Sequence, residues 1–244
     1  MFYRRILSFA VALTVVLSVA AATFATHPED KNSDKKNAQI VTPLNLAILI
    51  QDDLISQVGN ELNVTRDFIR SLPPGSRVMV GYITTGTLQV RQGFTTDLDN
   101  AANSLRIPIA SRSASSFNPY VEVIEALRRF DSGWRGTNAV LLISDGLDTS
   151  RGFDVTAAGN SLDLHRAIKQ ANDRNVAVYS FYAPSVGLTS HSHLAASYGQ
   201  SSLNRLAHET GGKAFFQGTT GFVSFDSYFR RLRETLNSQY ARAN

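Results

Sequence analysis

Short, unbroken hydrophobic runs alternate along this chain with longer segments in which hydrophobic residues recur at helical spacing. The runs fall at residues 46–50, 78–83, 139–143 and 176–181. A strand that is buried on both faces of a parallel sheet has this continuous apolar composition, whereas a strand with one wet face alternates. The pattern therefore predicts the central strands of a parallel sheet at these positions.

The segments between these runs predict helices. Their apolar residues recur every three or four positions, as in the segment that contains Val58 and Leu62. That segment stops at the proline pair that begins with Pro73, and another segment starts with Pro119 in a position that favours the beginning of a helix. The predicted helices cover residues 58–72, 97–105, 119–130, 162–174, 202–209 and 224–240.

Two further strands complete the predicted sheet. Residues 88–90 follow the strand 78–83 after a turn so short that only a hairpin can join them, which makes this strand antiparallel and places it at an edge. The last strand is predicted at residues 213–216. Because strands alternate with helices, the predicted fold is α/β: a doubly wound, mostly parallel six-stranded sheet with one antiparallel edge strand and helices on both faces.

The N-terminus has the pattern of an export signal. Arg4 and Arg5 precede an apolar run over residues 6–22, and small residues follow up to Ala25. This order is typical of a secretory signal peptide, predicted at residues 1–25. The alternative is an uncleaved membrane anchor, because the run is only slightly shorter than a span of about 20 residues. Both interpretations place the rest of the chain outside the cytoplasm: in the periplasm, at the cell envelope or secreted.

The rest of the chain divides into a leader and one domain. Residues 26–38 are polar and have no apolar period, which is typical of a flexible leader. Residues 39–244 contain all the predicted strands and helices, so we expect a single domain there.

Composition and charge exclude several classes of function. The chain contains no cysteine, which excludes disulfides, thiol catalysis and cysteine zinc sites. The formal net charge of +4 includes Arg4 and Arg5, so the predicted domain is nearly neutral, and its basic residues are not clustered as a nucleic-acid surface requires. No glycine-rich phosphate loop follows the first strand. We therefore expect neither a nucleic acid nor a nucleotide as ligand.

Acidic residues follow two central strands of the predicted sheet. Asp52 and Asp53 come directly after the strand 46–50, and Asp145 comes after the strand 139–143. In open α/β sheets, ligands bind beyond the carboxyl ends of the strands. Carboxylates and hydroxyls gathered at this end are oxygen ligands suited to a hard cation such as Mg²⁺.

The order of elements, the hairpin edge strand and the phrase Leu-Leu-Ile-Ser-Asp-Gly at residues 141–146 together resemble the von Willebrand factor type A (VWFA) domains. The resemblance covers roughly residues 39–240 and implies the strand order 3-2-1-4-5-6. More narrowly, the chain is similar to the secreted bacterial proteins called VWFA-related. That similarity rests on the phrases at residues 72–76, 80–82, 94–95, 199–200 and 223–225.

The resemblance also implies a candidate metal site. The family's metal-ion-dependent adhesion site combines an Asp-x-Ser-x-Ser motif after the first strand, a threonine before a later helix and an aspartate after the fourth strand. Matched to this sequence, the candidate Mg²⁺ ligands are Asp52, Ser56, Ser116, Asn118 and Asp145.

The match is incomplete, and two registers of the motif stay open. Read from Asp52, the motif has Leu54 where a hydroxyl is expected, and a leucine donates no oxygen. Read from Gln51, it loses its first carboxylate. Asn118 occupies the threonine position, with Ser116 two residues earlier as a substitute. Loss of a protein ligand weakens Mg²⁺ binding, so we expect a degenerate site, with a bound ion as the alternative.

These features favour an exported protein-binding module over an enzyme. A bound ion would accept a carboxylate from a partner protein; without an ion, the loops at the carboxyl end of the sheet would form the recognition surface. No Gly-x-Ser-x-Gly elbow follows any strand, which argues against a hydrolase. The alternatives are a structural component of a cell-envelope assembly, anchored by an uncleaved N-terminal segment, and, less favoured, a hydrolase. The recognition loops are expected at residues 51–56, 111–118, 145–161 and 184–199.

Overall fold

The computed structural model of the protein describes residues 40, 42–109, 116–134, 136–152, 161–218 and 224–243, with side chains described up to residue 239. The predicted signal peptide, residues 1–25, and the predicted leader, residues 26–38, lie outside the described residues. Within the described part, none of the helices has the length and hydrophobicity needed to cross a membrane.

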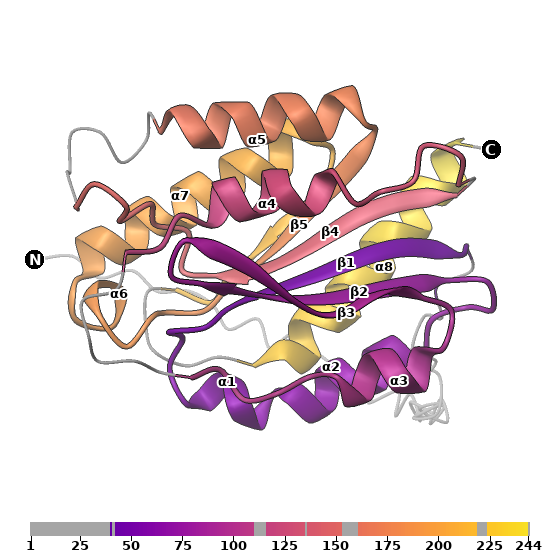
Figure 1. Cartoon of the computed structure of the whole chain (residues 1–244), viewed down its shortest axis with the longest axis horizontal. Helices are drawn as coiled ribbons and strands as arrows, with labels where there is room; N and C mark the ends of the chain where they lie inside the picture. Colours follow the sequence, from indigo (N-terminus) through magenta and orange to yellow (C-terminus); the bar gives the residue numbers. More distant parts are fainter. Residues whose placement is uncertain are drawn as a thin grey trace, which may run out of the picture. The chain divides into compact units, whose positions relative to one another are not determined.

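A six-stranded sheet forms the centre of the domain (Figure 1). Its strand order is β3-β2-β1-β4-β5-β6, and all neighbouring strands are parallel except β2 and β3. The predicted fold class and the antiparallel edge strand are therefore confirmed, and the strand order agrees with the one that the resemblance implied. The strands are β1 (Leu44–Gln51), β2 (Arg77–Thr84), β3 (Thr87–Thr95), β4 (Thr137–Ser144), β5 (Val176–Tyr182) and β6 (Ala214–Phe215).

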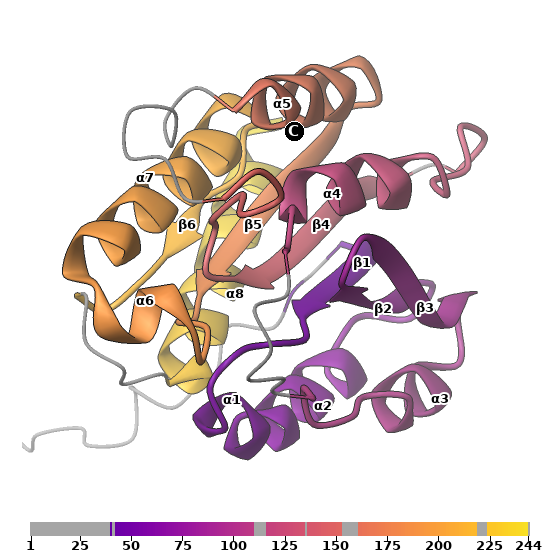
Figure 2. The ribbon, with the colours of Figure 1, turned by 60° about the vertical axis from the view of Figure 1, so that its left-hand side comes forward.

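Helices cover both faces of the sheet. Every residue of β1 is buried, as its continuous apolar sequence predicts for a central strand. Figure 2 shows α4 and α5 on one side of the sheet and α2 and α3 on the other. The helices are α1 (Gln57–Asn60), α2 (Leu62–Arg70), α3 (Leu98–Asn103), α4 (Pro119–Leu127), α5 (Leu162–Asp173), α6 (Leu188–His191), α7 (His193–Glu209) and α8 (Phe225–Ala243).

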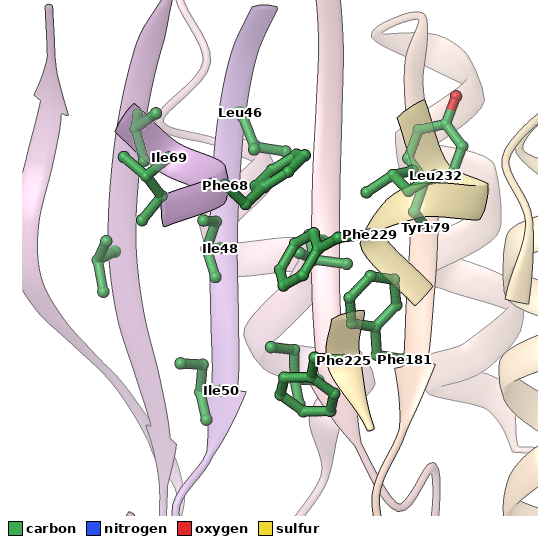
Figure 3. Close-up of a cluster of buried hydrophobic side chains, with 14 of the residues drawn as sticks. Leu46, Ile48, Ile50, Phe68, Ile69, Tyr179, Phe181, Phe225, Phe229 and Leu232 are labelled. Carbon is green, nitrogen blue, oxygen red and sulfur yellow. The ribbon is translucent and has the colours of Figure 1, made fainter. Parts of the chain in front are cut away.

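Two hydrophobic clusters hold these layers to the sheet. One lies between the sheet and α2, α3 and α8, and contains a group of aromatic rings (Figure 3). Phe229 stacks on Phe68 with ring centroids 4.2 Å apart and meets Phe181 edge-on at 4.9 Å. The other cluster lies beneath α4, α5 and α7 and includes Leu164 and Leu203. Because both clusters include side chains of the same strands, the sheet joins the two helical layers into one packed core.

The antiparallel edge strand is longer than predicted. The sequence predicts a strand at residues 88–90, whereas β3 continues to Thr95. Leu88, Val90 and Phe94 pack against the cluster beneath α4, while Gln89, Arg91 and Gly93 are exposed. This strand therefore alternates instead of forming a continuous apolar run. Register shifts interrupt its pairing with β2, and such irregularities discourage an edge strand from pairing with another chain.

One helix begins well before its predicted start. The sequence predicts a helix at residues 202–209 after a loop, whereas α7 starts at His193 and the short helix α6 precedes it. The additional turns bury Ala195 and Gly199. Alanine and glycine are too small to mark a helical hydrophobic period, so the pattern along the sequence does not reveal these turns. The extension brings α7 against the backbone of Asp145 at the carboxyl end of the sheet.

Candidate functional site

The carboxyl ends of β1 and β4 bring a group of buried polar side chains together. The two strands pair in parallel with Ile50 opposite Ile143, so the residues that follow them lie side by side. Gln51, Ser144 and Asp145 are exposed by only 1%, 0% and 3%. In Figure 1 this end of the sheet is on the left, where α6 and α1 lie. These polar groups therefore occupy the end of the sheet at which open α/β folds bind their ligands.

Gln51 lies at the centre of this group. Its amide nitrogen donates to Oδ1 of Asp145 at 3.1 Å and to Oδ1 of Asp53 at 2.7 Å. Its amide oxygen accepts from the Ser144 hydroxyl at 2.5 Å and from the backbone N–H of Asp145 at 3.3 Å. The reverse orientation of the amide would set its oxygen against two carboxylates, so the surroundings determine the orientation. One neutral side chain thus bridges both carboxylates.

The other contacts of Asp145 come from the following turn and from α6. The backbone N–H of Leu147 donates to Oδ1 at 3.1 Å, and the Thr189 hydroxyl donates to Oδ2 at 3.2 Å. Gly146 has a φ of 75°, and a β-carbon there would lie 2.4 Å from the backbone oxygen of Gly199. The Asp-Gly turn therefore requires its glycine, both for the backbone conformation and for the close approach of α7.

Burial raises the pKa values of the two carboxyl groups. The pKa of Asp53 rises from 3.8 to about 7, first because the side chain is withdrawn from water and second because the charge of Asp145 is close. The pKa of Asp145 is also raised by burial, although hydrogen bonds from Leu147 and from neighbouring side chains oppose the shift. The pair therefore binds protons more tightly than exposed carboxyl groups do.

Asp52 belongs to a separate network. Its carboxylate accepts from both terminal nitrogens of Arg106, at 2.6 and 2.7 Å, and from the backbone N–H of Ile109 at 2.8 Å. The Arg106 guanidinium also lies 3.9 Å from the centroid of the Tyr82 ring. A bidentate arginine–carboxylate pair has a fixed geometry. The network therefore holds residues 106–109 at the carboxyl end of β1.

The connection between β5 and α6 covers the end of β1. The backbone N–H of Val186 donates to the carbonyl of Asp53 at 2.8 Å, and the N–H of Ile55 donates to the carbonyl of Pro184 at 3.0 Å. Leu54, between these two contacts, is fully buried. These backbone hydrogen bonds keep the polar group at Gln51 and Asp145 out of contact with bulk water.

Hydrophobic side chains are exposed around this buried polar group. Ile107 and Ile109 lie in the segment that Arg106 fixes, and the others lie in the first turns of α4, α5, α6 and α7 or directly after β6. Among the described residues, every exposed large hydrophobic side chain is in this region of the fold. We call the set the carboxyl-end surface: Ile107, Ile109, Val121, Leu162, Leu188, Leu194 and Phe216.

Solved structures share this arrangement of strands and helices. An aerotolerance-related membrane protein from Bacteroides fragilis matches over 80% of this chain and 98% of its own, with a TM-score of 0.54 and 12% identity. BatB, a conserved hypothetical protein from Bacteroides thetaiotaomicron, matches over 82% and 98%, with a TM-score of 0.54 and 14% identity. A von Willebrand factor type A structure from Catenulispora acidiphila matches over 80% of this chain but 42% of its own, with a TM-score of 0.53 and 16% identity. This chain has the von Willebrand factor type A fold. Neither a protein-family model nor a curated protein matches it.

The von Willebrand factor A fold of this chain has Gln51 where the adhesion motif begins. Of the two registers that the sequence leaves open, the structure supports the one at Gln51, because this side chain and not Asp52 contacts Asp145. In this register Asp53 and Ile55 occupy the two serine positions. The carboxylate of Asp52 is engaged by Arg106 and does not contact Asp145, so in this structure Asp52 lies outside the group around Gln51.

The other predicted site residues do not join the polar group either. Ser56 is exposed just before α1, and Ser116 is exposed before α4. Asn118 caps α4, because its side chain accepts from backbone N–H groups of the first turn and donates to Asp163 at 2.9 Å. Of the predicted ligands, Asp145 alone belongs to the buried group around Gln51.

Several contributors to this end of the sheet are missing from the sequence-based set of site residues, among them Gln51, Arg106 and Thr189. Gln51 is the first polar residue after the apolar run of β1, so the end of the run is a usable signal for it. The contact of Arg106 with Asp52 spans 54 positions, and that of Thr189 with Asp145 spans 44. Such distant pairs leave no local pattern in one sequence.

The side chains of this group do not fit a bound Mg²⁺ ion. Mg²⁺ requires oxygen ligands in a near-octahedral arrangement. Here the N–H groups of Gln51 lie against the inner oxygens of Asp53 and Asp145, where a cation would have to bind. Within the described ranges, no group of three or more acidic or histidine side chains is placed to hold a metal ion.

Proposed function

We propose that this chain is an exported protein-binding module that contacts its partner through the carboxyl-end surface. The observation that carries the proposal is that the exposed large hydrophobic side chains of the described residues all lie in this region of the fold. Protein interfaces use such apolar anchors, surrounded by polar residues. Exposed apolar residues gathered at one end of a fold favour an interaction site, whereas isolated apolar residues spread over a surface do not.

Hydrogen bonds support this surface on two sides, which favours binding. The bidentate contact between Arg106 and Asp52 fixes the segment that carries Ile107 and Ile109. On the other side, the hydrogen bond from Thr189 to Asp145 ties α6 to the end of β4. A surface that is ordered before binding loses less conformational entropy when the partner arrives.

The arrangement of hydroxyl groups supports a binding role over hydrolysis. Ser144 is fully buried, and its hydroxyl donates to Gln51 while accepting from the backbone N–H of Gly146. A nucleophile needs an adjacent base and access to substrate. A serine-reactive fluorophosphonate probe is therefore expected to leave the protein unlabelled. Stoichiometric labelling would replace the binding proposal with a hydrolase.

Export is proposed from the sequence at residues 1–25, with an uncleaved anchor as the alternative. N-terminal sequencing of the chain isolated from its host separates the two. A start near residue 26 supports a released module. An intact N-terminus in membranes washed at high pH supports the anchored envelope component.

Site-specific photo-cross-linking tests the proposed surface. A photoreactive amino acid at Leu188 or at Leu194 is expected to capture the same partner, because both side chains are exposed on neighbouring helices. The control position is Asp131, which is exposed in the connection between α4 and β4 at the other end of the sheet. Serine at both leucines should weaken binding about tenfold. Equal capture from Asp131 would contradict the proposal.

A further inference from the structure

We propose that the amide of Gln51 takes the place of the divalent cation in this site, so that recognition at the carboxyl-end surface is independent of metal ions. The part of this proposal that concerns recognition of a partner rests on the function proposed above. Whether the site binds a cation is tested separately, because cation binding can be measured on the protein without a partner.

The hydrogen bonds of Gln51 satisfy both carboxylates. One nitrogen donates to Asp53 at 2.7 Å and to Asp145 at 3.1 Å, so its two hydrogens are directed to the oxygens of two carboxyl groups. The amide oxygen meets the Ser144 hydroxyl and a backbone N–H. All the polar atoms of the amide are therefore used. A cation at this position would have to displace these bonds and would meet N–H donors instead of oxygen ligands.

Burial independently supports this inference. A metal ion that binds a partner's carboxylate needs an open coordination position facing solvent. Gln51 and Asp145 are exposed by 1% and 3%, and Ser185 and Thr189 beside them by 3% each. The hydrogen bond from Val186 to Asp53 closes the strand end above them. A partner's side chain therefore has no direct access to the Asp145 carboxylate, while Asp53 is half-buried.

The placement of the amide makes the inference specific to one residue. Gln51 stands in the first position of the adhesion motif, where a carboxylate is expected for metal binding. Aspartate at this position would be one methylene shorter and would add a third carboxylate near Asp53 and Asp145. Three carboxylates around a small space repel one another, and a bound cation offsets this repulsion when they are ionised.

The first experiment is calorimetric titration of the full wild-type chain with Mg²⁺ and Mn²⁺, with Asp145→Asn as a control. We expect no saturable heat, and the same thermal unfolding curve in Mg²⁺ and in EDTA. Saturable wild-type binding that disappears in Asp145→Asn would overturn the proposal.

The second experiment uses variants of Gln51 to create cation binding. We expect Gln51→Asp to bind Mn²⁺ saturably, with loss of binding when Asp145→Asn is added. Gln51→Ala removes the bridging amide, so we expect lower stability that Mg²⁺ partly restores. A cation at ten times its dissociation constant raises the folding equilibrium constant about tenfold. A Gln51→Asp protein that folds but does not bind Mn²⁺ would overturn the assigned role of the amide.

The matched control is Asn45→Ala at the opposite end of β1. Asn45 is also fully buried, but its side chain donates to the neutral Asn138 at 2.9 Å. Its loss should lower stability with no response to Mg²⁺. If Mg²⁺ stabilises Asn45→Ala as much as Gln51→Ala, the effect is a general one and the proposal fails. Repeating the partner cross-linking in EDTA should leave the captured amount unchanged.

Discussion

Gln51, Asp53 and Asp145 share hydrogen bonds at the ends of two neighbouring strands, whereas Asp52, adjacent in sequence, pairs with Arg106. Consecutive acidic residues thus have different electrostatic environments. The carboxyl group of Asp53 is withdrawn from water beside a second carboxyl group, and its pKa rises. Asp52 is buried against the guanidinium of Arg106. The partner of each side chain, not its residue type, determines its role.

The raised pKa of Asp53 predicts a pH-dependent stability. A carboxyl group with a higher pKa in the folded chain binds its proton more tightly there. Its contribution to stability is complete below pH 3.8 and is lost as the pH rises through about 7. We expect the free energy of unfolding of the wild type to fall over this range relative to Asp53→Asn. Urea unfolding between pH 4 and 8 measures it, and Asp67→Asn, at an exposed position, should follow the wild-type curve.

The contact between Arg106 and Asp52 predicts a larger loss of stability than an exposed ion pair. The side chains of Arg106 and Asp52 are exposed by 21% and 11%, against 40% and 78% for Arg70 and Asp99. Arg106→Met leaves a carboxylate without its partner, so we expect a loss of about 3 kcal/mol. Arg70→Met should cost about 0.5 kcal/mol. Equal losses in urea unfolding would show that the buried pair does not fix its segment.

At the level of elements, the central strands β1, β2, β4 and β5 follow their sequence patterns closely, whereas α7 departs from its prediction. Its first turns carry small buried residues, and they lie where the backbone of Asp145 passes. The close approach depends on Gly199, since a β-carbon there would lie 1.9 Å from the carbonyl oxygen of Asp145. The position of α7 is therefore set by contact with the end of β4, and not by its own helical period.

Gly199→Ala tests this contact. Alanine favours a helix over glycine by about 1 kcal/mol, which by itself would stabilise α7. The clash with the Asp145 carbonyl outweighs this preference, so we expect a net loss of about 3 kcal/mol. The control is Gly93→Ala in β3, where a β-carbon meets no atom within 4 Å. Thermal unfolding of both variants measures the difference. A stabilised Gly199→Ala protein would show that α7 is free to move.

In the whole molecule, the two hydrophobic clusters lie on opposite faces of one sheet and share its strands. Phe229 of α8 packs on Phe68 and Phe181 in one cluster. Trp134, the only tryptophan of the chain, lies in the connection between α4 and β4, and α4 packs in the other cluster. A domain with one continuous core unfolds as a unit. A substitution that destabilises one cluster should therefore shift the unfolding of the other cluster to the same extent.

Phe229→Ala tests this cooperativity. Removal of the ring from the stacked group should cost about 4 kcal/mol of unfolding free energy. We expect the same shift of the urea midpoint from Trp134 fluorescence and from circular dichroism. Phe216→Ala serves as the control, because Phe216 is exposed by 38%, and it should cost less than about 1 kcal/mol. Separate midpoints for the two signals would show that the helical layers unfold independently.

The sequence by itself determined the alternation of strands and helices, the hairpin and the antiparallel edge. These features follow from periodicity, because burial on one or two faces leaves a repeat that can be read along the chain. It also placed Asp145 at the carboxyl end of a central strand, since an apolar run that stops at a polar residue marks the strand end. In each case the relevant residues are close together in sequence.

The tertiary structure alone decided the partners at this end of the sheet. Gln51 meets Asp145 across 94 positions, and Arg106 meets Asp52 across 54. Such pairs depend on how the strands and loops pack in space, and no local repeat encodes them. The sequence therefore left two registers of the motif open, and the packing of β1 against β4 selected the one in which an amide, not a carboxylate, faces Asp145.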